Sequence, residues 1–218
     1  MYLYELLGNE NDPVYQELEI ANGNRHYDFL RSIVIAALRV GRPFLSQAII
    51  KALNYHAISC LHTHAGEYRP CQVVVGSYEP PQHYRVQALM DDFVNEINRL
   101  WGSVDAVVLA THVLWRINYI HPFINGNGRT ARAASYYVLC LSAGQLLKGN
   151  VILPELLRLN RDRYCEALRL GDISFQNGAL DLSVLHNLMQ ELLAQQFESA
   201  GIEPVADEPA DGISSGSP

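Results

Sequence analysis

One stretch guides the interpretation of the whole chain: residues 121–132 read His121-Pro122-Phe123-Ile124-Asn125-Gly126-Asn127-Gly128-Arg129-Thr130-Ala131-Arg132. A proline disfavours the α conformation in the residue before it, so the preceding helix is predicted to end at His121, with the imidazole at a loop mouth. Gly126 and Gly128 stand just ahead of an apolar helical pattern, and glycine permits the backbone geometry that turns successive N–H groups toward an anion. The stretch therefore predicts an anion-binding loop at a helix N-terminus.

Two arginines support this interpretation. Arg129 and Arg132 are three residues apart, so they share one face of the predicted helix, opposite its apolar stripe. The helix dipole disfavours cations in this first turn. A bound polyanion would make the two arginines favourable there, because a guanidinium group donates two parallel hydrogen bonds to a phosphate. A glycine-rich turn followed by exposed arginines is the simpler alternative. The histidine, the loop and both arginines together favour phosphate-centred transfer chemistry.

Apolar residues at helical spacing dominate the rest of the chain. Helices are predicted around residues 29–38, 46–60, 86–100, 107–117, 128–143, 160–170 and 181–198, with Ser46 capping the second and Ser103 the fourth. The short β-branched run Val73–Val75, closed by two prolines, predicts a hairpin or flap rather than a sheet. The expected fold class is therefore all-α with a short β-hairpin flap at about residues 65–81.

Composition and charge limit the class of partner. The chain has 218 residues, 49% of them apolar, and a net charge of −7, and no Lys or Arg follows Arg169. No part of the sequence supplies a broad basic face, so nucleic acid is not expected as the main partner. No apolar run approaches the ~18 residues of a membrane span, so no membrane association is expected either. Four cysteines without paired spacing and no visible leader favour the cytoplasm.

The chain is predicted to have three segments. Residues 1–25 form an N-terminal extension, and residues 26–200 form one domain that contains the flap and the motif at 121–132. Residues 201–218 are rich in Pro, Gly, Ser and acids and are expected to be an acidic flexible tail.

The motif resembles the signature of the Fic (filamentation induced by cAMP) family, His-Pro-Phe-x-(Asp/Glu)-Gly-Asn-Gly-Arg-x-x-Arg. Residues 65–69 and 76–81 resemble the flap of that family, and residues 160–164 resemble the helix after its motif. The resemblance implies a Fic-type helical bundle that moves AMP from ATP to a Ser, Thr or Tyr hydroxyl of a target protein, with Mg²⁺ as cofactor.

The same resemblance assigns roles to residues. His121 would be the general base that deprotonates the target hydroxyl. The α-, β- and γ-phosphates of ATP would be bound by Gly126, Asn127, Gly128, Arg129 and Arg132. An extended segment of the target protein would pair with the flap at Gln72, Val73, Val74 and Val75.

Asn125 departs from the family pattern, which has Asp or Glu there to hold Mg²⁺. An amide oxygen can bind a hard cation but brings no charge, so weakened metal binding and altered transfer are expected. A degenerate Fic domain that serves as a nucleotide-binding or protein-interaction module is the alternative, as is transfer of another nucleotide or of a phosphoryl group. No match to the autoinhibitory motif of the family is found. Either the activity is not inhibited from within the chain, or a separate, antitoxin-like protein inhibits it. Action in its own cell or in a host cell stays open.

Overall fold

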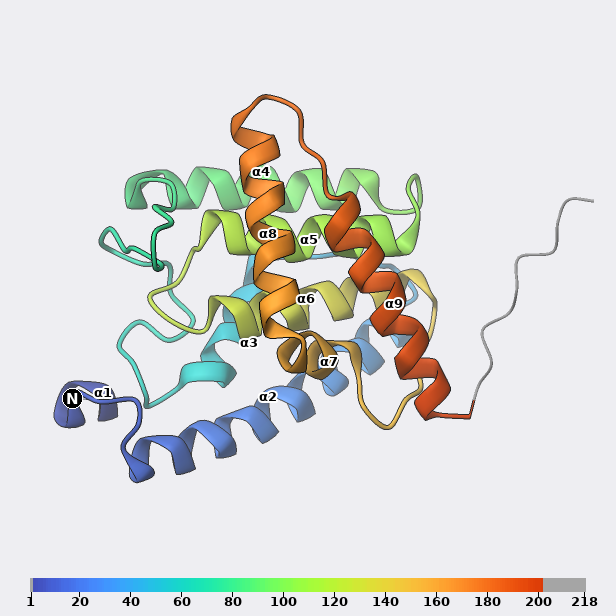
Figure 1. The fold of residues 1–218 in the computed structure, drawn as a ribbon. Coiled ribbons are helices and arrows are strands. Elements are labelled where there is room, and N and C mark those ends of the chain that lie inside the picture. Colours follow the sequence, from blue (N-terminus) through green and yellow to red (C-terminus); the bar gives the residue numbers. More distant parts are fainter. Residues whose placement is uncertain (1, 202–218) are drawn as a thin grey trace, which may run out of the picture.

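The computed structural model of the protein describes residues 2–201, and helices account for most of them (Figure 1). In chain order the elements are α1 (Leu3–Leu7), α2 (Pro13–Val40), α3 (Gln47–Ile58), the 3₁₀ helix η1 (His83–Arg85), α4 (Val86–Leu100), α5 (Ala106–Ile120), α6 (Asn127–Ser142), α7 (Leu153–Leu159), α8 (Arg161–Gln176) and α9 (Ser183–Ser199). The predicted all-α class is confirmed.

Helix α6 lies at the centre of the bundle. It contacts α2, α3, α5 and α7, and nearly every residue from Thr130 to Leu141 is buried. Ala131, Ala133 and Ala134 are almost completely buried, and such small side chains let neighbouring helices approach closely. In Figure 1, α4, α5 and α6 run across the view, α2 lies below them, and α8 and α9 cross in front. The packing on all sides fixes the N-terminus of α6 in space.

All seven predicted helices are present. The structure adds two short α-helices, and one of the seven, α2, is longer than predicted. The additions are α1 and α7, which are only five and seven residues long. Helix α2 begins at Pro13, well before the predicted start near residue 29, because the Asp12 side chain accepts a hydrogen bond from Val14 N–H at 2.9 Å. A capping Asp followed by Pro at the first helical position is a start signal that periodicity alone misses.

One of the two predicted helix caps is confirmed and the other is wrong. Ser46 accepts a hydrogen bond from Ile49 N–H at 3.2 Å and caps α3 as expected. The cap of α5 is Asp105, whose side chain accepts from Val107 N–H at 2.8 Å and from Val108 N–H at 3.1 Å. Ser103 instead donates its hydroxyl to the Leu100 carbonyl at 2.7 Å, closing the end of α4.

The predicted β-hairpin is reduced to a tight turn. A single antiparallel bridge joins Val75 and Tyr78 through two backbone hydrogen bonds of 2.9 Å. The Tyr78 hydroxyl donates to the Tyr119 carbonyl at 2.6 Å and ties the turn to α5. The two prolines Pro80 and Pro81 cannot donate to a ladder, which limits further strand pairing.

Two of the predicted segment boundaries are not tested by the structure. Helix α2 runs through the predicted boundary at residues 25–26 without a break, and the division into extension and domain stays a prediction. Residues 202–218 of the predicted acidic tail lie outside the described residues. None of the helices within residues 2–201 combines the length and the apolar character that a bilayer crossing demands.

The two candidate caps of α5 give a direct test. Asp105→Ala is expected to lower Tm by about 2–4 °C, because losing a cap costs about 1 kcal/mol in a chain of this size. Ser103→Ala removes an exposed contact and should leave Tm within about 1 °C. Differential scanning calorimetry measures both, and equal shifts would contradict the assignment of Asp105 as the cap.

Candidate active site

The motif begins where α5 ends. Helix α5 stops at Ile120, as the sequence predicts, and His121 adopts the left-handed conformation with φ 50° and ψ 59°. The carbonyl of His121 accepts a hydrogen bond from Arg69 Nε at 2.8 Å, and the carbonyl of Pro122 accepts one from the Arg69 N–H at 2.8 Å. The unusual backbone at the histidine is therefore held from outside the motif.

The loop after His121 brings the N-terminus of α6 close to α3. Gly126 has φ 76°, and a Cβ there would lie 2.7 Å from Ile58 Cγ2, so only glycine fits. The Asn127 side chain accepts from Phe123 N–H at 2.9 Å and donates to the Phe123 carbonyl at 2.8 Å, which closes the loop. Among residues 2–201 no acceptor takes the N–H groups of 127–129, which is the arrangement an anion-binding helix N-terminus requires.

Asn54 of α3 anchors this loop and was not singled out by the sequence. Its side chain is fully buried, and its Nδ2 donates to the Asn125 carbonyl at 2.9 Å and to Thr130 Oγ1 at 3.3 Å. Its Oδ1 accepts from Gly66 N–H at 2.9 Å. An amide on the apolar face of a predicted helix was the available signal, because a buried polar group needs partners.

Arg69 joins both ends of the flap to the histidine loop. It is only 2% exposed, and its guanidinium donates to the carbonyls of Cys71, at 3.1 Å, and of Pro81, in addition to that of His121. No carboxylate within residues 2–201 pairs with it. Removing this side chain would leave the carbonyls of His121, Cys71 and Pro81 without this donor, so Arg69 is a positioning residue of the site.

The predicted docking residues of the flap differ in their surroundings. Gln72 is committed to the flap itself, because its side chain donates to the Pro80 carbonyl at 2.8 Å and accepts from His83 N–H at 3.2 Å. Val75 forms the bridge to Tyr78. The backbone groups of Val73 and Val74 have no hydrogen-bond partner in the part of the chain that the structure describes, and the Val74 side chain is 62% exposed.

A cavity of about 940 Å³ opens at the N-terminus of α6. It brings together His121, the loop residues 124–128 and four arginines, Arg129, Arg132, Arg158 and Arg161. The first two arginines were predicted; the other two come from α7 and α8, which follow the motif in the chain. Arg158 is paired with Glu155 at 2.8 Å, whereas Arg132 and Arg161 have no carboxylate within ion-pair distance among residues 2–201.

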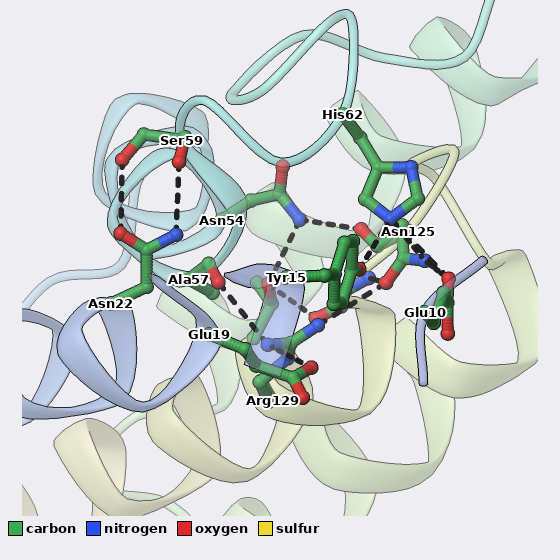
Figure 2. Close-up of polar contacts among 12 residues, drawn as sticks. Glu10, Tyr15, Glu19, Asn22, Asn54, Ala57, Ser59, His62, Asn125 and Arg129 are labelled. Atoms are coloured by element: carbon green, nitrogen blue, oxygen red, sulfur yellow. Dashed lines mark hydrogen bonds and ion pairs between the residues drawn. The ribbon is translucent and has the colours of Figure 1, made fainter. Parts of the chain in front are cut away.

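Arg129 is held by acceptors from three segments (Figure 2). Its guanidinium pairs with Glu19 Oε1 at 3.0 Å and donates to the Ala57 carbonyl and to Asn125 Oδ1, both at 3.2 Å. Glu19 lies in the part of α2 that the sequence did not predict as helix, so its approach to the motif was missed.

The electrostatic environment keeps the histidines of the cavity neutral. The pKa of His121 is lowered to about 4, mainly by burial; the hydrogen bond to the Asn118 carbonyl raises the pKa and the Arg69 charge lowers it. The Nδ1 atom lies 3.4 Å from that carbonyl, which only accepts, so the proton belongs on Nδ1 and the lone pair on Nε2. Burial, aided by Arg129 and Arg132, lowers the pKa of His26 to about 3.

The Asn125 side chain does not fit a metal ion held at this position. Its Oδ1 accepts hydrogen bonds from Gly126 N–H at 2.6 Å and from Arg129, which occupies both lone pairs. Its Nδ2 donates to Glu10 Oε1 at 3.1 Å and lies 3.0 Å from His62 Nε2. Within residues 2–201, His, Cys, Asp and Glu side chains nowhere gather in a group of three that could bind a metal.

Comparisons with known proteins match the central part of the chain to one family. Residues 44–139 match the model of the Fic/DOC family. The protein adenylyltransferase Fic of Drosophila willistoni is 34% identical over 109 residues, which are 50% of this chain and 21% of that protein. Its counterpart in Drosophila yakuba is 36% identical over 112 residues, again 50% of this chain and 21% of the relative. The chain thus spans about a fifth of the length of the curated relatives it matches.

Solved structures share the fold at low sequence identity. Fic-1 (residues 134–508) from C. elegans has a TM-score of 0.66 and 22% identity and covers 84% of this chain and 50% of its own. A Fic-domain-containing signaling protein from Bacteroides thetaiotaomicron has a TM-score of 0.65 and 22% identity, with coverage of 94% and 81%. The fold, the motif and the matched segment together define a Fic domain. Residues 44–139 match the Fic/DOC family, as the resemblance predicts, and the solved Fic structures share the fold of the chain.

Gly126 is the glycine whose replacement the site should tolerate least. Gly126→Ala combines left-handed strain with a clash against Ile58, and is expected to lower the free energy of unfolding by about 2–5 kcal/mol. Gly144→Ala is the matched control, since Gly144 also has positive φ, 67°, but nothing within 4 Å of its Cβ direction. It should cost only about 1–2 kcal/mol. Urea denaturation measures both, and equal losses would contradict the close approach.

Proposed function

We propose that this protein is an adenylyltransferase that moves AMP from ATP to a Ser, Thr or Tyr hydroxyl of a target protein. The observation that carries the proposal is the neutral imidazole of His121 at a cavity lined by the first N–H groups of α6 and by Arg132, both without an acceptor or carboxylate partner among residues 2–201. The printed name of the Drosophila relatives, protein adenylyltransferase, supports it.

In the proposed reaction the target hydroxyl oxygen attacks the α-phosphorus of ATP. The hydroxyl proton passes to Nε2 of His121, and the bond from the α-phosphorus to the bridging oxygen breaks, so that pyrophosphate leaves. The N–H groups at residues 127–129 and the guanidinium of Arg132 would stabilise the developing charge. Arg129 would join them once its pair with Glu19 opens. No step is assigned to a metal ion, because Asn125 has no oxygen lone pair to offer.

The target protein would dock on the flap. An extended segment can pair with the backbone groups of Val73 and Val74, which lack partners within residues 2–201. Backbone pairing fixes the register of the target hydroxyl without demanding a particular sequence. Arg69 would transmit this register to the catalytic loop, since it binds both the flap and the His121 carbonyl.

A nucleotide-binding module without transfer is the second candidate. The ion pair between Glu19 and Arg129 favours it, because the carboxylate neutralises a guanidinium that would otherwise stabilise the leaving pyrophosphate. The two candidates agree on nucleotide binding and differ on covalent labelling of protein. Transfer of the γ-phosphoryl group is distinguished by the position of the label in ATP.

Label transfer tests the role of His121. With α-³²P-ATP and a cell lysate, the wild type is expected to label protein, and His121→Ala should lower the rate by about 10²–10⁴-fold because the general base is lost. His186→Ala on α9 is the matched control; His186 does not line the cavity, so labelling should persist. Labelling that survives His121→Ala would refute the role of His121. ATP binding without any labelling would favour the non-catalytic module.

The protonation state of His121 gives an independent test. The pKa near 4 means that the imidazole is already the base form at pH 7 and stays so as the pH falls to about 5. Histidine NMR, with the signal assigned by its loss in His121→Ala, should show no protonation shift between pH 7.5 and about pH 5. A midpoint between pH 6 and 7 would contradict the burial of this side chain.

A further inference from the structure

Asn125 makes four side-chain hydrogen bonds, and their partners fix the orientation of its amide. Its Oδ1 faces two donors, the Gly126 N–H and Arg129 Nη2, and its Nδ2 faces the Glu10 carboxylate, which only accepts. The Nδ2 atom also lies 3.0 Å from Nε2 of His62. Both lone pairs of Oδ1 and one N–H of Nδ2 are therefore used.

The partners on the Nδ2 side belong to a cluster of mostly buried side chains. His62 is 6% exposed and Tyr15 is 1% exposed, and the Tyr15 hydroxyl lies 2.8 Å from the same Nε2 atom. The ring of Tyr4 lies beside that of His62, with the ring centroids 4.8 Å apart and the planes tilted by 32°. Figure 2 shows Glu10 and Tyr15 on the N-terminal segment, reaching the motif from one side. This segment precedes the part of the chain that matches the family.

The partner on the Oδ1 side is the first arginine of the motif. Arg129 has three acceptors, and the Asn125 oxygen supplies one of them beside Glu19 and the Ala57 carbonyl. A guanidinium held by several acceptors in fixed directions loses little freedom when it binds a phosphate.

We propose that Asn125 is a positioning residue rather than a metal ligand: its amide joins Glu10 and His62 to Arg129 and fixes that guanidinium at the N-terminus of α6. A carboxylate at position 125 could not do this, because it has no N–H to donate to Glu10. It would also stand as a third negative charge beside Glu10 and Glu19. The contact with the N-terminal segment therefore explains why position 125 has an amide where the family pattern has an acid.

Reversing the polarity of one hydrogen bond provides the decisive experiment. Asn125→Asp places a carboxylate against Glu10, and adding Glu10→Gln supplies a donor in return, so the bond re-forms in the opposite direction. Asn125→Asp alone is expected to lower Tm by about 4–8 °C, and the N125D/E10Q double variant should recover at least half of that loss.

The matched control is N125D/E17Q. Glu17 is exposed on α2, and its side chain makes no hydrogen bond or ion pair within residues 2–201, so this variant has the same net charge as N125D/E10Q without the restored bond. It should remain as unstable as N125D. Equal recovery in both double variants would reduce the effect to net charge, and a wild-type Tm in N125D would mean that the amide is not needed. Either result overturns the proposal.

A second readout separates positioning from a purely structural role. By calorimetric titration, N125D is expected to weaken ATP binding about tenfold with or without MgCl₂, and E10Q is expected to restore it in the double variant. Tighter binding by N125D in MgCl₂ only, independent of position 10, would instead identify a metal ligand and refute the proposal. The Tm comparison of the wild type, N125D and the two double variants needs neither ATP nor AMP transfer. It therefore tests the proposal even if the protein proves not to be an adenylyltransferase.

Discussion

The close approach of α6 to α3 at Gly126 is the constraint on which the site depends. A Cβ at Gly126 would clash with Ile58, and the buried amide of Asn54 ties the loop to α3 at the same point. Since α6 is packed on all sides, its N-terminus cannot shift without repacking the core. The unpaired N–H groups of its first turn and the two motif arginines are therefore presented to the cavity in one fixed arrangement.

The charges around the cavity follow from this arrangement. Four arginines from α6, α7 and α8 converge there, and only Arg129 and Arg158 have carboxylate partners among residues 2–201. Burial is the main cause of the low pKa of His26 and His121; the charges of Arg129 and Arg132 lower the pKa of His26 further, and that of Arg69 lowers the pKa of His121. A polyphosphate would add negative charge beside Arg132 and Arg161, and a neutral imidazole next to it is available as a base.

The N-terminal segment changes how the motif can be interpreted. In isolation, Asn125 is a substitution that removes a carboxylate from a phosphate site. In the structure, its amide satisfies Glu10 and His62 on one side and Arg129 on the other. The effect of one residue in a motif therefore depends on which distant segment packs against it, and a sequence motif cannot by itself show whether a departure weakens a site or completes it.

The sequence by itself determined the helical class, the end of α5 at His121, the loop at Gly126 and the two arginines of α6. These features depend on local rules: apolar spacing, the effect of proline on its neighbour and the conformational freedom of glycine. Only the tertiary structure decided that Glu10, Glu19, Asn54 and Arg69 contact the motif, since Glu10 is separated from Asn125 by 115 positions. Such contacts depend on how helices pack, and a buried amide or guanidinium finds its acceptors only after the chain has folded around it.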